Sequence, residues 1–150
     1  MPYINTRPSE NLAVLATLDA ASVAASTVTT GWVNAGQWLH ILGLIKTGVL
    51  GASATVDAKL QQATDSAGTG AKDVTGKAIT QVVKASGDNK QVYINLKGQE
   101  LDVTNGFSFV RLSVTVGTAA SIVDATLFGM LPRFGSAEAM NQAAVAQIVA

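Results

Sequence analysis

The sequence predicts an all-β protein, an antiparallel β-sandwich or jelly roll of about eight strands. Several short segments alternate apolar and polar residues with a period of two, as half-buried strands do. Turns rich in glycine, asparagine and aspartate separate these segments at short intervals, which is typical of sandwiches and barrels. The middle of the chain lacks the long helical patterns that a parallel α/β sheet would require.

The first half of the 150-residue chain contains four expected strands. In chain order they are Leu12–Leu18, Ser22–Thr30, Trp38–Lys46 and Thr55–Ala63. The second is rich in Val and Thr, which favour a pleated surface, and the third is the most apolar segment of the chain. The fourth alternates, so Val56, Ala58 and Leu60 are expected to share its buried face.

The second half of the chain is expected to supply the remaining strands, which are Ala78–Val83, Gln91–Leu96, Phe107–Val116 and Ser121–Gly129. The polar, glycine-rich segment Thr64–Gly76 is expected to be a loop. Phe107–Val116 alternates most clearly, with its valines and leucine on one face and Arg111, Ser113 and Thr115 on the other. The turn Gly117–Ala120 follows, and the two strands around it are expected to pair as an antiparallel hairpin.

Two extensions flank the expected sandwich, which spans residues 11–130. Residues 1–10 are predicted to form an extended arm, because Pro2 and Pro8 fix the backbone and remove amide donors. Residues 131–150 are predicted to form an arm or a short helix, since Ser136–Ala150 is rich in alanine and Ser136 is a good helix cap. We expect both ends to reach neighbouring subunits. The candidate interface residues are Tyr3, Ile4, Arg7, Leu131, Arg133, Phe134 and Met140.

The low charge content limits the classes of molecule that the chain is expected to bind. Charged residues make up 13% of the chain, about half the usual share, and the formal net charge is zero. A weakly charged surface is expected where subunits meet, although a Thr/Ser-rich surface of a secreted β-protein would also explain it. Zero net charge argues against nucleic acid as a partner. The longest apolar run, Leu39–Ile45, is too short to span a membrane, and no leader pattern is visible, so a soluble protein made in the cytoplasm is expected.

The sequence offers little material for catalysis. With one histidine, His40, and no cysteine, a metal site would need to be built from carboxylates. A structural role for His40 at a strand surface is favoured. Gly68–Asp73 lacks the spacing of a phosphate-binding loop. The carboxylates that could be paired, as in a glycosidase, lie in or beside polar loops: Asp57, Asp65, Asp73 and Asp88. We therefore expect no enzyme activity, no metal and no cofactor.

Two blocks of sequence resemble a known group of proteins. The segment Gly51–Asp65, and the block from Gly98–Val103 through Phe109–Leu112, resemble small virion structural proteins of tailed bacteriophages. The resemblance covers roughly Ala21 to Phe128 and implies a β-sandwich or jelly roll. It further implies capsid decoration (cement), in which the protein binds the outside of the assembled shell, often as a trimer, and bridges capsid subunits. The partners would then be the major capsid protein and further copies of the chain, on the virion after synthesis in the host cytoplasm.

Two other functional classes stay open from the sequence. One is another phage structural role: head–tail joining, a tail tube or a head-fibre base. The other is a carbohydrate-binding module, in which Trp32, Trp38 or Tyr93 would provide an exposed stacking platform.

Overall fold

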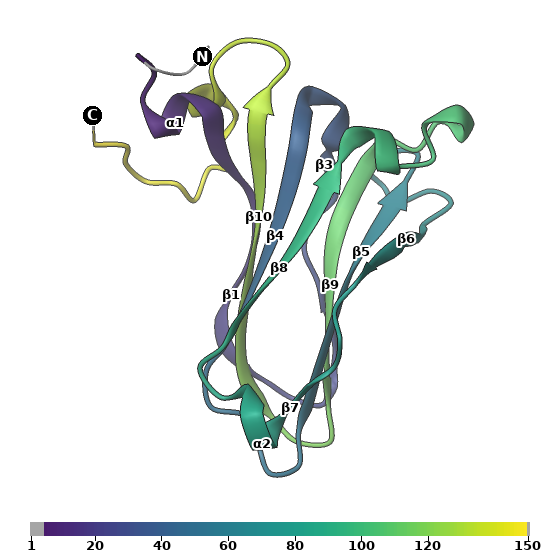
Figure 1. The fold of residues 1–150 in the computed structure, drawn as a ribbon, viewed down its shortest axis with the longest axis vertical. Helices are drawn as coiled ribbons and strands as arrows, with labels where there is room; N and C mark the ends of the chain where they lie inside the picture. Colours follow the sequence, from purple (N-terminus) through teal and green to yellow (C-terminus); the bar gives the residue numbers. More distant parts are fainter. Residues whose placement is uncertain (1–4, 150) are drawn as a thin grey trace.

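Two antiparallel sheets pack face to face in the computed structural model, which describes residues 5–149 (Figure 1). Sheet A has four strands, in the order β1 (Leu12–Val23), β10 (Ser121–Pro132), β4 (Trp38–Thr47) and β8 (Gln91–Lys97). Sheet B has the order β2 (Ser26–Thr29), β9 (Phe109–Gly117), β5 (Thr55–Ala63) and β6 (Lys72–Ala78). Two short strands complete sheet B, with β3 (Val33–Asn34) paired to β9 and β7 (Val82–Val83) paired to β5.

The strand order is that of a jelly roll. Over residues 5–149, counting β2 with β3 and β6 with β7 as one strand each gives eight strands, ordered 1-8-3-6 in sheet A and 2-7-4-5 in sheet B. This nesting of early strands with late ones is the double Greek key of the jelly roll. The predicted fold class is therefore confirmed. The short helices, all in connections or at the ends, are α1 (Pro8–Asn11), α2 (Lys84–Gly87), η1 (Ala35–Gln37), η2 (Gly98–Glu100), η3 (Val103–Asn105) and η4 (Ala137–Met140).

The core lies between the sheets and is built from the alternating strands. Every second residue of the central strands is buried, as predicted for Val56, Ala58 and Leu60. The buried residues of the two strands that follow later in the chain are Val110, Leu112, Val114, Val116, Val123, Ala125 and Leu127. Burying each of the larger side chains contributes about 1.5–3 kcal/mol. The period of two thus correctly identified which side of each strand faces the core.

The expected hairpin around Gly117–Ala120 is wrong. β9 belongs to sheet B and pairs with β5, whereas β10 belongs to sheet A and pairs with β1 and β4. The connection crosses from one layer to the other and includes Thr118 at φ 72°. Alternation identifies the buried face of a strand, but it does not identify the neighbouring strand. Here the two inward faces oppose each other across the core instead of lying side by side.

Two other boundaries differ from expectation. The expected strand Ser22–Thr30 is divided, since β1 runs to Val23 on β10 and β2 starts at Ser26 on β9. The expected loop Thr64–Gly76 ends early, because β6 begins at Lys72. Val74 is the one residue of β6 that is buried, so the strand has too little alternation to be visible in the sequence. Of the strand expected at Ala78–Val83, only its first residue and β7 are paired.

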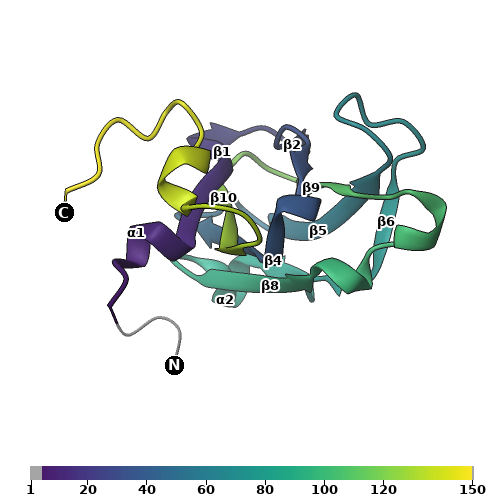
Figure 2. The ribbon, with the colours of Figure 1, turned by 90° about the horizontal axis from the view of Figure 1, so that it is seen from above.

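The ends also depart from expectation. Tyr3 and Ile4 lie outside the described residues, and Pro8 begins a helical turn where an extended arm was expected. The helix expected over Ser136–Ala150 is reduced to the turn η4, although Ser136 does cap it through a hydroxyl that accepts the Glu138 amide. η4 and α1 lie side by side at one end of the sandwich (Figure 2). After η4 the chain lies against β1, and this position is incompatible with a continued helix.

Candidate functional site

The outer face of sheet A combines apolar side chains with polar ones. Alternation turns one set of side chains away from the core on each of its four strands. We call this set the sheet A outer face, and its apolar members are Leu12, Val14, Leu42, Leu44, Tyr93, Ile122, Phe128 and Met130. All of them are partly or largely exposed, and Tyr93 is 65% exposed. Antiparallel sheets with one solvated face normally carry polar residues there.

Cross-strand register arranges this face in rows. Along β10 and β4, Phe128 lies beside Leu42, and Thr126 lies beside Leu44. The row nearest one end is charged, because Asp124 lies beside Lys46 with 3.4 Å between the Asp124 Oδ2 and Lys46 Nζ atoms. Apolar rows therefore occupy the middle of the face, with an ion pair below them.

His40 is at the other end of the sheet A outer face. It is partly exposed and lies between Met130 on β10 and Lys97 on β8. This position agrees with the expected role of a histidine at a strand surface. Neither neighbour is a carboxylate or a hydroxyl, so the immediate surroundings of His40 do not form a nucleophile–base arrangement.

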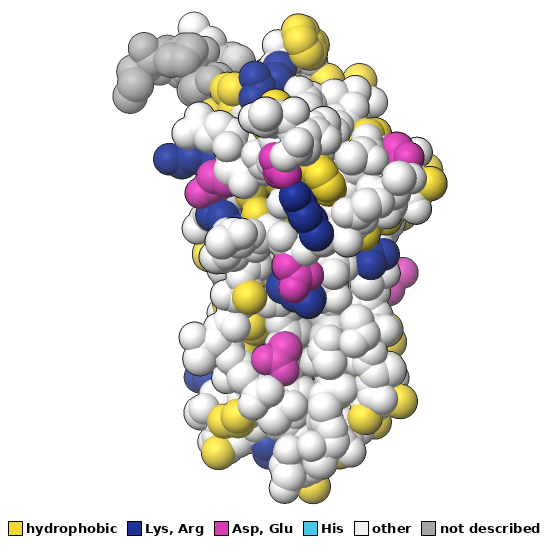
Figure 3. Space-filling view, turned by 90° about the vertical axis from the view of Figure 1, so that its right-hand side faces the viewer, with side chains coloured by type: hydrophobic (Ala, Val, Ile, Leu, Met, Phe, Trp, Pro, Cys, Tyr) yellow, Lys and Arg dark blue, Asp and Glu magenta, His cyan; other side chains and the backbone are white. Residues whose placement is uncertain are grey.

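The outer face of sheet B is polar and hydrogen-bonded across its strands. Arg111 Nε donates to Gln61 Oε1 at 2.9 Å, and Gln61 Nε2 donates to Asp73 Oδ1 at 3.0 Å. Lys59 Nζ donates to Asp73 Oδ2 at 2.8 Å, and this bond and that from Gln61 hold the pKa of the Asp73 carboxyl below its usual value. The Arg111 guanidinium also stacks 4.6 Å from the centre of the Trp32 ring. Charged groups of both signs alternate down this side of the molecule (Figure 3).

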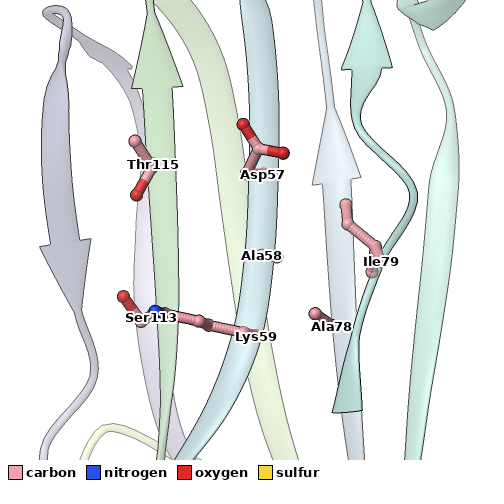
Figure 4. A pocket seen from close by; sticks show the side chains of 7 residues that line it. All are labelled: Asp57, Ala58, Lys59, Ala78, Ile79, Ser113 and Thr115. Carbon is pink, nitrogen blue, oxygen red and sulfur yellow. The ribbon is translucent and has the colours of Figure 1, made fainter. Parts of the chain in front are cut away.

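A shallow hollow of roughly 290 Å³ opens on sheet B beside this network. Its lining comes from β5, β9 and the β6 side, as Figure 4 shows. Asp57 accepts a hydrogen bond from Gln81 Nε2 at 2.8 Å, and Lys59 is held by Asp73. None of the seven lining residues is a histidine or a cysteine. The hollow can offer hydrogen bonds to a ligand, and its register places Ser113 beside Lys59 and Thr115 beside Asp57.

A second hollow separates the free edges of the two sheets. It has a volume of roughly 450 Å³ and lies between the Gly76–Thr80 backbone of sheet B and the Val92–Asn95 backbone of β8. Tyr93 borders it. The sandwich is thus open along the side where β6 and β8 run past each other.

The candidate interface residues within the described part of the chain lie where α1, the end of β10 and η4 meet. Arg7 lies 3.7 Å from Glu138, so the two ends of the chain are joined by an ion pair. Arg133 Nε donates to the Trp38 carbonyl at 3.2 Å. Leu131 is partly buried, and Met140 packs against the edge of the core. Phe134 is the apolar member that is most exposed, with 71% of its surface open to solvent.

The structure excludes one of the three residues that were candidates for an aromatic platform. Trp38 is 1% exposed and belongs to the core. Trp32 lies on sheet B beneath Arg111, whereas Tyr93 lies on the free edge of sheet A. The three rings therefore cannot contact one ligand together.

Sequence reasoning missed the sheet A outer face. Its trace in the sequence is that Leu42 and Leu44 are apolar although they alternate with buried Ile41 and Ile45. A continuous apolar run of this kind is typical of a strand that is covered on both sides. In this molecule one of the two sides is uncovered.

Metal and membrane sites were also sought in residues 5–149. Within that range, no group of three or more His, Cys, Asp or Glu residues is placed to hold a metal ion. No helix in the same range has the length and apolarity needed to cross a bilayer.

Comparisons with known proteins concern the fold. No protein-family model and no curated protein matches the chain. Among solved structures, YomS, a protein derived from the SPBc2 prophage, is similar over 79% of this chain and 94% of its own, at 12% identity and a TM-score of 0.42. A chain of the empty virus-like particle of cowpea mosaic virus is similar over 89% of this chain and 88% of its own, at 10% identity and a TM-score of 0.43.

A third similar structure comes from an enzyme. The CBM22-1–GH10 modules of Clostridium thermocellum xylanase 10B, complexed with xylohexaose, are similar over 84% of this chain and 27% of their own, at 12% identity and a TM-score of 0.45. At these identities the likeness concerns the β-sandwich fold alone.

Proposed function

We propose that this chain is a non-catalytic structural protein of a phage virion, which binds the outside of the assembled capsid and stabilises it by bridging capsid subunits. One observation carries the proposal: apolar side chains project from the C-terminal end of the molecule and lie outside the core. Phe134 is 71% exposed and Val149 is 83% exposed, and Ile148 beside it is exposed as well. Ile148 and Val149 are adjacent in the chain, and exposed apolar groups that lie together mark protein–protein contact sites.

The position of these groups supports a bridging role. The segment that carries Ile148 and Val149 follows Gln142, the last residue bound to the β1 backbone, and leads away from the sandwich (Figure 1). A terminal segment placed in this way can reach a second subunit while the sandwich stays on the first. Burying one such side chain contributes about 1.5–3 kcal/mol, so few anchors are needed in each copy.

The mechanism is burial repeated over many copies. A specific contact needs roughly 1,000 Å² or more of buried surface. When many copies bind a symmetric shell, each additional contact acts at high effective concentration, so modest contacts give a stable coat. In this proposal the partners are the major capsid protein and further copies of the chain, and the location is the capsid surface after synthesis in the host cytoplasm.

The surface chemistry supports a role without catalysis. In the sheet B hollow, Lys59 is bound to Asp73 and Asp57 accepts a hydrogen bond from Gln81. The resemblance of Gly51–Asp65 to phage virion proteins points to the same class.

A binding experiment tests the proposal. Heads of the encoding phage, assembled without this chain, are mixed with the full chain, with Phe134→Ser and with a variant that ends at Ala143. We expect both variants to cosediment with heads at least about tenfold more weakly than the full chain, which corresponds to the loss of one anchor. Val103→Ser is the matched control, because Val103 is 62% exposed on η3 and lies outside the C-terminal segment. Equal binding of all four proteins would refute the proposal.

Other virion positions differ in their assembly. Native mass spectrometry separates them, since a hexamer or a larger ring would favour a tail tube or a head–tail joint over capsid decoration. If the chain forms such a ring and does not bind heads, a tail-tube or head–tail joining role would replace capsid decoration.

A second candidate function is glycan binding on the outer face of sheet B. The specific observation in its favour is the row of planar polar groups from Arg111 through Gln61 to Asp73, with Trp32 at its end. Such groups can bind sugar hydroxyls, and an indole ring can stack on a sugar. A glycan array tests it: binding that is lost in Trp32→Ala and kept in Tyr93→Ala would favour this function over the first.

A further inference from the structure

The two sheets differ in what they present outward. Outward positions of sheet B carry Thr, Ser, Gln, Lys and Asp, which hydrogen-bond to each other. Outward positions of sheet A carry Leu, Val, Phe and Met side chains in its middle rows, next to polar residues such as Thr126 and Asn95. Uncovered apolar area of this extent on one face marks a contact surface. The chemistry and order of the rows then indicate what can cover it.

We propose that the sheet A outer face binds the same face of a second copy of this chain, around a two-fold axis that runs parallel to the strands between β10 and β4. Such an axis exchanges β10 with β4 and β1 with β8. A residue on β10 therefore lies over the β4 residue of the second copy that has the same number as its own cross-strand neighbour on β4. The contact is isologous, and two sheets stacked in this way form the aligned packing seen inside sandwiches.

The register makes this arrangement complementary in the middle of the face. Phe128 would lie over Leu42 of the second copy, and Thr126 would lie over its Leu44, because these pairs are cross-strand neighbours. The symmetry repeats each contact in reverse. The apolar Phe128–Leu42 pairs thus meet across the contact, and each Leu44 lies against the methyl-bearing side chain of Thr126.

The charges at the end of the face are complementary as well. Asp124 would lie over Lys46 of the second copy, and Lys46 over its Asp124. The Lys46–Asp124 ion pair of each copy, with 3.4 Å between Nζ and Oδ2, would then join the same pair of the second copy. The four charged groups would alternate in sign. The charges favour this orientation of the two copies over the reversed one. If the second copy were turned so that its strands ran the opposite way, each Lys46–Asp124 pair would lie over His40 and Met130 and would lose its charged partners.

The area is sufficient for a specific contact. Four strands spaced by about 4.8 Å, each with about nine residues that rise about 3.3 Å, give a face of about 600 Å². Two such faces bury about 1,200 Å², which is the lower limit for specific interfaces. The contact is therefore a dimer interface of modest size. It does not depend on binding to a capsid, and it differs from a trimer, whose contacts would join unlike surfaces.

Cross-linking tests the axis directly. The chain has no cysteine, so one introduced cysteine is the sole thiol. Thr126→Cys places it on β10 next to the proposed axis, where the two copies of the residue are separated by about 10 Å of sheet spacing. We expect a short bismaleimide to convert the full-length variant to a covalent dimer. Thr115→Cys, the control on the outer face of sheet B, should remain monomeric on a denaturing gel.

Sedimentation of the full chain and its variants completes the test. Leu44→Glu should weaken the dimer about 100-fold, about tenfold from each of the two symmetry-related substitutions, while Thr27→Glu on sheet B leaves it unchanged. Lys46→Asp should weaken it by repulsion, and the double variant Lys46→Asp with Asp124→Lys should restore it. A monomeric wild-type chain, a trimer, or a dimer that Thr126→Cys does not cross-link would each overturn the proposal, whether or not the chain binds heads.

Discussion

The side-chain oxygen of Asn141 accepts a hydrogen bond from the backbone amide of Val14, at 2.8 Å. The next residue, Gln142, donates its own amide to the Val14 carbonyl, also at 2.8 Å. Together they supply both partners that a neighbouring strand would give to Val14. β1 is the edge strand of sheet A, and an open edge can pair with other chains. The C-terminal segment therefore covers part of this edge.

Removal of this contact should loosen the C-terminal segment. In Asn141→Ala the Val14 amide loses its partner, and we expect the free energy of unfolding to fall by about 1 kcal/mol. The Gln142 amide should exchange with solvent at least several-fold faster, because its bond to Val14 is no longer supported. Hydrogen exchange followed by mass spectrometry measures both effects. Gln147→Ala is the control on the same segment, and similar exchange in both variants would contradict the role of Asn141.

Gly129 makes room for the Trp38 ring. A Cβ atom on Gly129 would lie 2.3 Å from Trp38 Cδ2, far inside contact distance, so Gly129→Ala must displace a buried ring. We expect a loss of stability of about 1–3 kcal/mol, the usual cost of overpacking. Gly43→Ala is the matched control on β4, since its Cβ would meet Leu112 at 3.5 Å, which is ordinary contact. Urea denaturation compares the two, and equal stabilities would show that the ring moves freely.

Trp38 itself should matter for stability. Because the ring is buried, Trp38→Ala should cost about 3–5 kcal/mol through the cavity it leaves. Tyr93→Ala, on the exposed edge of sheet A, should change stability by less than about 1 kcal/mol. Thermal unfolding monitored by circular dichroism separates the two variants. A mild effect of Trp38→Ala would mean that the ring is not part of the core.

The stability of the fold should fall in acid. The hydrogen bonds from Lys59 and Gln61 hold the pKa of Asp73 below its ordinary value of 3.8, and those from Lys72 and Asn105 lower the pKa of Asp102. A carboxyl with a lower pKa in the folded state stabilises folding above its unfolded pKa, and this contribution is lost as the pH falls through the folded value.

Urea midpoints measured between about pH 5 and pH 3 should therefore decline. The urea midpoint of Asp73→Asn should decline less steeply with falling pH than that of the wild type, because the variant has no carboxyl to protonate at this position. Salt at about 1 M should narrow the difference between them, since these pairs are solvent-exposed. An unchanged pH dependence in Asp73→Asn would contradict the assignment.

The expectations that held were those that depend on the periodicity of single strands. Alternation in Thr55–Ala63 and Phe107–Val116 identified the buried faces, because a side chain on a strand alternates sides whatever lies beside it. The absence of helical patterns identified the fold class. These properties are local, so a sequence contains them directly.

Neighbour relations were decided only by the tertiary structure. The strands around Gly117–Ala120 separate into different sheets, because stacking their two buried faces across a common core removes both from water. Trp38, one of three residues considered for an exposed platform, is a core residue, because Gly129 on another strand leaves space for it. The C-terminal segment, for which an arm or a short helix was expected, covers part of a sheet edge, since Asn141 and Gln142 bind the backbone of Val14.

The proposed surfaces follow the same division. The sequence by itself determined a weakly charged β-sandwich with apolar residues at its ends, and this rests on composition and local pattern. Only the folded molecule decided which apolar residues stay outside. Leu42 and Leu44 on β4 and Phe128 on β10 are apolar, although the opposite face of each strand already forms the core. Their exposure depends on whether a further layer covers sheet A. Within residues 5–149, α1 and η4 contact one end of β1 and β10, and we propose that a second molecule covers the rest of the face.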